Sequence, residues 1–108
     1  MEENLSPACT YRIVFDVFEV RMSHWIEEPS IYRVADGALL FDLKGDVWSA
    51  DRIVWHSDSV VEMQVRKYPG RVSCTLTLDL AAQTGRAACG TDTYTGFLPD
   101  LKAWVLRY

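Results

Sequence analysis

Two histidines are the side chains best suited to acid–base or metal chemistry, and each has a carboxylate close by in the sequence. His24 precedes Glu27 by three positions, and His56 precedes Asp58 by two. The H-x-x-E spacing suits one face of a helix, but no second histidine follows His24 after four residues, as a zinc-protease motif requires. The flanking residues favour a loop, so we interpret His24 as a surface side chain beside Trp25. We expect no metal site and no cofactor.

Nucleophile and phosphate motifs give no stronger signal. The chain has no G-x-S-x-G sequence, and the run 57–59 (Ser-Asp-Ser) is typical of a turn, because short polar side chains bond to their own backbone. The 6 glycines occur singly, so none forms a phosphate-binding loop. The chain is therefore predicted to be non-enzymatic. An enzyme that uses His24 or His56 with a nearby carboxylate is kept as an alternative.

The three cysteines, Cys9, Cys74 and Cys89, are odd in number and widely spaced. This pattern predicts neither a disulfide framework nor a C-x-x-C site. The first residues also lack the basic and apolar regions of a secretory signal. We therefore expect small buried thiols in a reducing environment, and a cytoplasmic protein.

Length and charge narrow the classes further. The chain has 108 residues, 49% of them hydrophobic, which predicts a single domain over residues 1–108. No apolar run approaches the ~20 residues of a membrane helix. The net charge of −4 argues against a nucleic-acid partner, which attracts basic surfaces.

The charge is unevenly distributed. Residues 16–62 hold ten Asp and Glu against four Arg and Lys, a net −6, whereas residues 63–108 hold three against six, a net +3. Many of the central acids lie in or beside predicted turns, so one end of a sheet could be acidic. That end could simply be solvated, or it could dock a basic protein partner with tryptophans as anchors. The candidate partner-binding residues are Asp46, Asp51, Asp58, Trp48 and Trp25.

The strongest structural signal is a hairpin between residues 60 and 80. Apolar side chains alternate with polar ones on both sides of a Pro-Gly turn at residues 68–71, which is the pattern of two half-buried strands. Turn and alternation agree on one register, which pairs Val65 with Cys74, Met63 with Leu76 and Val61 with Leu78.

Weaker signals complete the predicted fold. A second hairpin is expected over 31–34 and 38–43 with a type I′ turn at Asp36-Gly37, a strand over 52–56, and a weak final strand over 86–89. Residues 11–22 favour one long strand with a bulge near Val17-Phe18, and 99–108 favour a helix with Leu101, Trp104, Val105 and Tyr108 on its apolar side. The fold class is α+β, mainly β: an antiparallel meander of about six to eight strands with one C-terminal helix packed on the sheet.

A run through the middle of the chain carries a family resemblance. It comprises Leu43, Trp48-Ser49, Ile53-Val54-Trp55, Val61, Val65 to Gly70 and Leu76 to Leu80. This run resembles small β-rich bacterial orphan proteins, some of them similar to immunity proteins of polymorphic toxin systems. The resemblance implies a non-enzymatic protein that occludes a toxin's active site, and it implies no particular site residue.

The predicted function is therefore a cytoplasmic protein-interaction domain, specifically an immunity-type inhibitor that binds a basic partner through an acidic face. One alternative is a small-molecule-binding β-domain with an apolar cavity lined by Phe15, Met63, Trp55 and Trp104. A homodimer through an unprotected edge strand is a further hypothesis.

Overall fold

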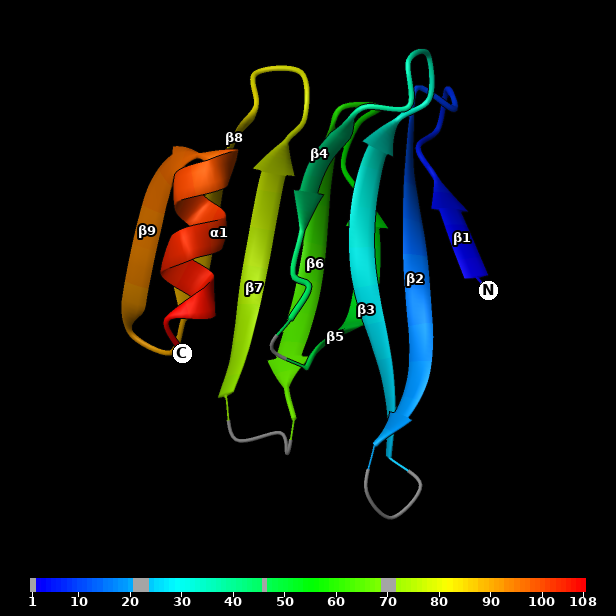
Figure 1. The fold of residues 1–108 in the computed structure, drawn as a ribbon. Coiled ribbons are helices and arrows are strands. Elements are labelled where there is room, and N and C mark those ends of the chain that lie inside the picture. Colours follow the sequence, from blue (N-terminus) through cyan, green and yellow to red (C-terminus); the bar gives the residue numbers. More distant parts are fainter. Residues whose placement is uncertain (1, 21–23, 46, 69–71) are drawn as a thin grey trace.

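A computed structural model describes residues 2–20, 24–45, 47–68 and 72–108. The first sheet, sheet A, is antiparallel with the order β1-β2-β3-β4. Its strands are β1 (Glu2–Leu5), β2 (Tyr11–Val20), β3 (His24–Arg33) and β4 (Leu39–Asp42). Figure 1 shows β2 and β3 as the two longest strands on this side of the molecule.

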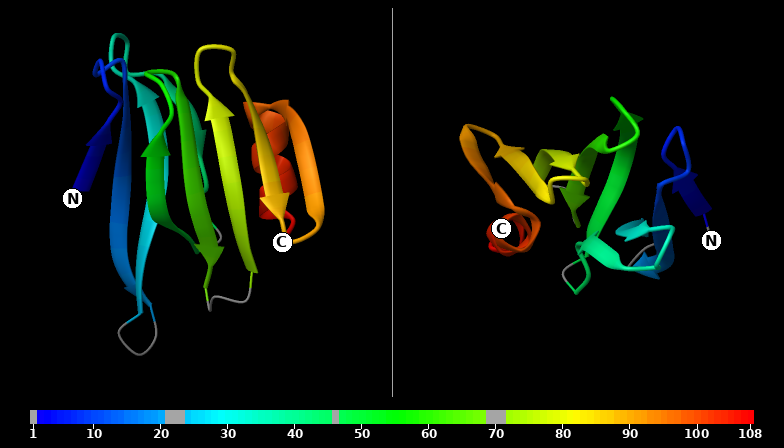
Figure 2. Two further views of the ribbon diagram at one scale, coloured as in Figure 1. Left: turned by 180° about the vertical axis from the view of Figure 1, so that it is seen from behind. Right: turned by 90° about the horizontal axis from the view of Figure 1, so that it is seen from above.

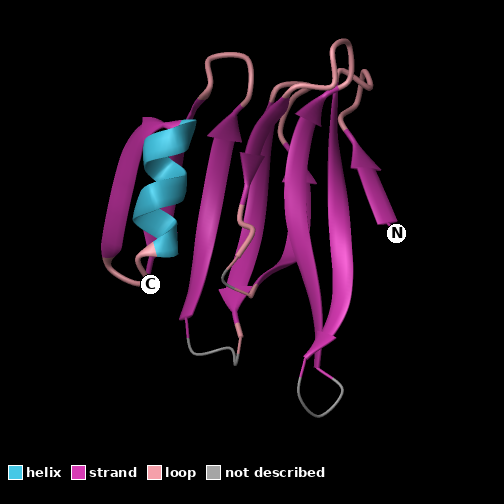
Figure 3. Cartoon of the chain, in the orientation of Figure 1, coloured by secondary structure: helices cyan, strands magenta, loops and turns pink. Residues whose placement is uncertain are grey.

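The second sheet, sheet B, is antiparallel with the order β5-β6-β7-β8-β9. Its strands are β5 (Trp48–Trp55), β6 (Val60–Lys67), β7 (Val72–Asp79), β8 (Thr84–Cys89) and β9 (Asp92–Phe97), followed by the helix α1 (Leu98–Leu106). Every strand pairs with its neighbour in sequence within its sheet, as Figure 3 shows. The predicted mainly β meander with one C-terminal helix is confirmed, with nine strands in the described residues rather than six to eight.

Strand β5 joins the two sheets. Near its start, the Ser49 hydroxyl accepts a hydrogen bond of 3.0 Å from the Glu27 N–H on β3. At its end, Trp55 Nε1 donates a bond of 2.6 Å to Asn4 Oδ1 on β1. The strand therefore runs from β3 to β1, and the two sheets share one core. Figure 2 shows the arrangement of the two sheets from above.

The predicted hairpin forms with the predicted register. Val65 pairs with Cys74, Met63 with Leu76 and Val61 with Leu78. All six side chains are at most 3% exposed, and they make up the middle of the core. The predicted turn at 69–71 lies outside the described residues.

Helix α1 covers the inner face of sheet B. Its buried side chains are Leu98, Leu101 and Val105, and Trp104 packs against the same core. Leu101 approaches Gly85 on β8 so closely that a Cβ added to that glycine would lie 2.9 Å from Leu101 Cδ2. The predicted apolar side is confirmed for Leu101, Trp104 and Val105, whereas Tyr108 lies beyond the end of the helix and packs against the core. Among the described residues, no helix is long and apolar enough to cross a membrane.

Strand β2 confirms the extended prediction for the N-terminal segment, but the predicted bulge is wrong. The pairing of β2 with β3 continues without a shift from Tyr11↔Arg33 to Val20↔His24. The inward column Tyr11, Ile13 and Phe15 is buried, and the next member, Val17, is 44% exposed. The alternation of apolar side chains changes at Val17 because the strand leaves the core there. A bulge with an extra residue is therefore not needed to explain it.

Three predictions about local structure need correction. Residues 24–27, expected to be a loop, begin strand β3, and strands β1 and β9 were not predicted at all. The turn after β3 is not type I′, which requires a positive φ at two consecutive residues. Among the described residues 33–38, only Gly37 has a positive φ, +69°. Its backbone instead closes with bonds from the Gly37 N–H to Arg33 O and from the Arg33 N–H to Ala38 O, which gives a four-residue loop.

The cysteine prediction was also wrong. Cys74 on β7 and Cys89 on β8 form a disulfide, with their Cα atoms 4.3 Å apart, while Cys9 is a free, exposed thiol. The two positions face each other at the end of the β7–β8 ladder, one step beyond the pair Thr75↔Ala88. The pairing of β7 with β8 brings the two cysteines together, and their separation of 15 residues in the sequence does not by itself indicate this contact.

Candidate functional site

Trp48, predicted as an aromatic anchor, is fully buried. Its side chain is 0% exposed within the core at the start of β5. Its Nε1 atom has no hydrogen-bond partner among the described residues. A side chain without exposed surface cannot contact a partner, so this prediction is corrected: Trp48 supports the junction of the two sheets.

Asp58 has a structural partner. Its Oδ1 accepts a bond of 2.7 Å from the Ala8 N–H in the loop after β1. Hydrogen bonds from the hydroxyls of Thr10 and Ser6, together with that N–H, hold the pKa of Asp58 below its ordinary value. The carboxylate therefore ties the β5–β6 turn to the β1–β2 loop.

Asp51 lies elsewhere, on the outer face of sheet B. Its carboxylate is 3.4 Å from Arg66 Nη2, and both side chains are exposed. The pair borders an open hollow of about 500 Å³ whose lining includes Gln64, Ser73 and Thr75. Asp46 lies outside the described residues. Asp51 and Asp58 therefore do not lie on one face together.

Of the two predicted tryptophan anchors, Trp25 is the exposed one. It is 61% exposed and lies on the face of the β2–β3 hairpin that, nearer the other end, carries the buried column of Ile13 and Ile31. The pairings Val17↔Glu27 and Glu19↔Trp25 place four side chains on that face. We call Val17, Glu19, Trp25 and Glu27 the Trp25 face.

The Trp25 face combines apolar and acidic groups without basic ones. Its pairs alternate, with Val17 opposite one glutamate and Trp25 opposite the other. The whole segment, residues 16–20 and 24–28, contains four acidic residues and neither Lys nor Arg. Figure 1 shows that β2 and β3 reach beyond the ends of β6 and β7 here, so this part of the hairpin projects from the body of the molecule.

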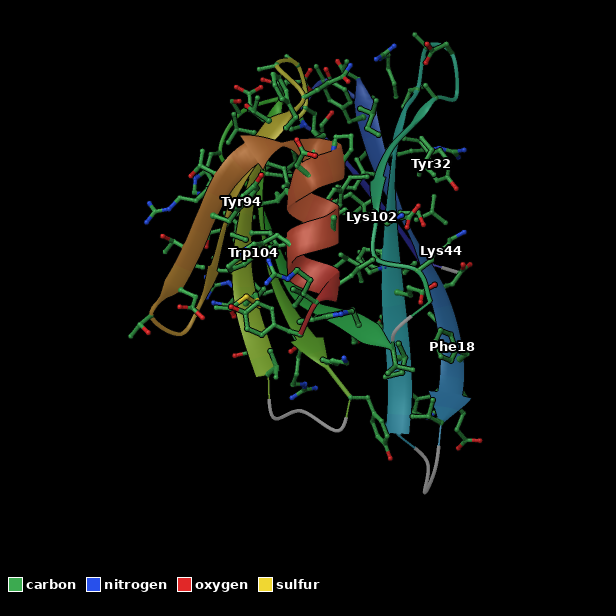
Figure 4. The ribbon with its side chains drawn as sticks, turned by 60° about the vertical axis from the view of Figure 1, so that its left-hand side comes forward. Phe18, Tyr32, Lys44, Tyr94, Lys102 and Trp104 are labelled. Atoms are coloured by element: carbon green, nitrogen blue, oxygen red, sulfur yellow. A yellow bond between two sulfur atoms is a disulfide. The ribbon has the colours of Figure 1, made fainter. Side chains whose placement is uncertain are left out.

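The opposite side of the hairpin holds a polar cluster in which Glu28 and Asp42 are buried and Asp16 and Lys44 are exposed. Glu28 is 7% exposed, and burial raises the pKa of its carboxyl, with a smaller contribution from the nearby Asp16 and Asp42, while a bond from the Gly45 N–H acts in the other direction. Lys44 Nζ lies 3.7 Å from the Asp16 carboxylate. Figure 4 shows Lys44, Phe18 and Tyr32 on the side of sheet A that faces away from α1.

Asp42 connects this cluster to the helix. Lys102 on α1 donates a bond of 2.8 Å to Asp42 Oδ1. Burial alone would raise the pKa of Asp42, but the bonds from Lys102 and from the Lys44 N–H outweigh it and lower the pKa. The ion pair therefore links sheet A to the helix that covers sheet B.

His56 pairs with a carboxylate on β6. His56 Nε2 is 2.9 Å from Glu62 Oε1, and not beside Asp58 as the sequence suggested. His56 and Glu62 are 49% and 33% exposed. Nothing is described of the His24 side chain. No group of three or more His, Cys, Asp or Glu among the described residues is arranged to hold a metal ion.

The cavity predicted for a small ligand is not lined as expected. Phe15 and Met63 are buried in the packed core, and Trp55 is bonded to Asn4. Trp104 borders an open hollow of about 370 Å³ with Asp92, Thr93, Arg107 and Tyr108. There it stacks on Tyr94 with ring centroids 5.7 Å apart and meets Tyr108 edge-on.

Comparison with known protein families, curated proteins and solved structures finds no match to this chain. The candidate site therefore rests on the geometry alone. Sequence reasoning selected Trp25 but missed Val17, Glu19 and Glu27. The apolar phase change at Val17 was the available signal, because it marks the point at which β2 leaves the core.

Proposed function

We propose that this protein binds a basic protein partner through the Trp25 face. The exposure of Trp25, 61% on a projecting two-stranded ribbon, carries the proposal. Exposed tryptophan is a frequent energetic centre of protein interfaces, because it buries a large area at a small cost in conformational entropy. An exposed two-stranded ribbon suits another protein surface better than a small molecule, which usually binds in a concave pocket.

Charge complementarity supports a basic partner. Glu19 and Glu27 flank the apolar pair on the Trp25 face, and Asp16 and Glu28 lie on the reverse side of the same segment. Such a field accelerates association with a positively charged surface and weakens as salt screens it. An immunity-type inhibitor of a basic toxin is the specific form of this proposal, and the family resemblance supports it.

Affinity capture from the native host, followed by titration of the purified partner, tests the proposal. We expect Trp25→Ala to weaken binding of that partner by about 2 kcal/mol, or roughly 30-fold. Leu39→Ala is the matched control, since Leu39 is 49% exposed at the other end of sheet A, and it should leave binding unchanged.

Charge variants separate the Trp25 face from the rest of the acidic surface. Glu19→Gln with Glu27→Gln should slow association and reduce its salt dependence, whereas Asp51→Asn on sheet B should not. Equal binding by the wild type and Trp25→Ala would overturn the proposal. Loss of binding in Asp51→Asn alone would move the site to sheet B.

The cytoplasmic location is part of the proposal and has its own test. Disulfides persist mainly in oxidising compartments. Thiol titration of the protein isolated from its host under alkylating conditions distinguishes the two environments. Three free thiols support the cytoplasm, whereas Cys9 alone, with the Cys74–Cys89 bond intact, indicates an oxidising compartment.

A further inference from the structure

Strand β9 forms an open edge of sheet B. It pairs with β8 on one side, and the described residues provide no strand on the other. Figure 2 shows it at the outside of the molecule, remote from sheet A. The strand contains no Lys, Arg or Pro, the residues that commonly protect an edge from pairing.

The other end of sheet B is not open in the same way. Strand β5 lies against sheet A, with Ser49 bonded to Glu27 and Trp55 bonded to Asn4. In sheet A, the outermost strands β1 and β4 have four residues each. The six residues of β9 are therefore the longest free edge that the described strands offer.

The ladder determines which backbone groups of β9 face outward. The Cα distance of 4.3 Å between Cys74 and Cys89 fits a non-hydrogen-bonded antiparallel pair, so the backbone groups of Cys89 face β9. Hydrogen-bonded and non-hydrogen-bonded pairs then alternate along β8 and β9, starting from the hydrogen-bonded pair Cys89↔Asp92. The bond of 3.0 Å from the Leu98 N–H to Gln83 O falls at a position where this alternation expects a hydrogen-bonded pair. The N–H and C=O groups of Thr93, Thr95 and Phe97 consequently point to the open edge.

We propose that two copies of the chain pair antiparallel through β9 and join their five-stranded sheets. With Thr95 opposite Thr95 of the second copy, the outward groups of Thr93 meet those of Phe97, and each edge satisfies the other. The side chains of these three residues are exposed on the outer face of sheet B, and Phe97 is 63% exposed. Thr–Thr and aromatic–threonine pairs across strands are favourable, so the strand is complementary to itself.

The inner face of β9 is already organised for such pairing. The ring of Tyr94 lies over Gly96, where an added Cβ would be 3.0 Å from its Cε2 atom, and the same ring stacks on Trp104 of α1. In the proposed register Tyr94 lies opposite Gly96 of the second copy. Figure 4 shows Tyr94 and Trp104 side by side on this face.

Light scattering coupled to size exclusion, over a series of protein concentrations, tests the pairing. The wild type and Thr95→Val should both be dimers at high concentration. Thr95→Pro removes an outward N–H without removing a bond to β8, so it should be monomeric under the same conditions. A wild type that remains monomeric throughout, or a Thr95→Pro variant that remains dimeric, would overturn the proposal.

A second variant decides the matter if Thr95→Pro does not fold. Thr95→Lys keeps the backbone N–H but places two ammonium groups opposite each other across the two-fold axis, so it should also be monomeric while its circular dichroism matches the wild type. A dimer that persists in Thr95→Lys would count against this edge. Trp25→Ala should remain dimeric, because the pairing is independent of the proposed partner site.

Discussion

The two sheets use the same strand chemistry for different purposes. In β6 and β7 the apolar side chains face the core along the whole strand, from Val61 to Val65 and from Cys74 to Leu78. In β2 the inward column is buried only as far as Phe15, and its continuation carries Val17 and Glu19 into solvent. Sheet B, with its helix and disulfide, therefore holds most of the packed core, and the far half of the β2–β3 hairpin carries the proposed partner surface.

Core truncation should distinguish sheet B and its helix from the hairpin most strongly. Leu101 on α1 is fully buried against Gly85 of β8, so Leu101→Ala should lower the free energy of unfolding by about 3 kcal/mol. Val17→Ala on the Trp25 face should change it by less than about 0.5 kcal/mol. Urea titration of both variants measures the difference, and similar losses would remove the distinction between the two regions.

Removal of the disulfide should cause the next largest loss in the free energy of unfolding. Cys74 and Cys89 close a segment of 15 residues, for which the loss of chain entropy in the unfolded state predicts a stabilisation of about 3 kcal/mol. Thermal unfolding of a Cys74→Ser, Cys89→Ser double variant, compared with Cys9→Ser as a control, measures it. Partner binding should survive the double variant at temperatures where it stays folded. Loss of binding in the folded double variant would place the site on sheet B.

Substitution of Glu28 should change the free energy of unfolding by a smaller amount, and this change should depend on pH. Because burial raises its pKa in the folded state, ionisation of Glu28 costs more there than in the unfolded chain. Its favourable contribution is present below the ordinary value of 4.5 and is lost as the pH rises through the folded pKa. Glu28→Gln keeps an acceptor for the Gly45 N–H, so it should stabilise the protein at pH 7 by about 1 kcal/mol.

That stabilisation should disappear at acid pH. Urea titrations of the wild type and Glu28→Gln between pH 3 and pH 8 should converge at the acid end, about where the unfolded carboxyl is protonated. Glu19→Gln, an exposed residue of the same hairpin, is the control. A stability difference that is constant over the whole range would show that Glu28 is not desolvated.

Sequence reasoning succeeded where two local signals agreed and failed where a distant contact decided the structure. Alternation and turn residues together specified the β6–β7 register. The last residues of β3 were predicted as a strand, but residues 24–30 were not, and this part contains Pro29, which is unusual inside a strand. In the structure, Pro29 lies where the neighbour of β3 changes from β4, paired at Ser30, to β5, bonded at Glu27.

The site was predictable to a similar degree. Trp25 and Trp48 were both candidate aromatic anchors, and the sequence did not indicate which of the two is exposed. Only the crossing of β5 over sheet A buries Trp48. The disulfide likewise depended on the pairing of β7 with β8, and a weakly patterned strand such as β8 does not specify that register from its own residues.

Hydrogen–deuterium exchange, with and without the captured basic partner, tests the role of the β2–β3 hairpin most directly. We expect the partner to slow exchange in residues 16–20 and 24–28, and to leave β6 and β7 unchanged. Slower exchange confined to sheet B, which includes Asp51, or to the β5–β6 turn that contains Asp58, would contradict the assignment of binding to the Trp25 face.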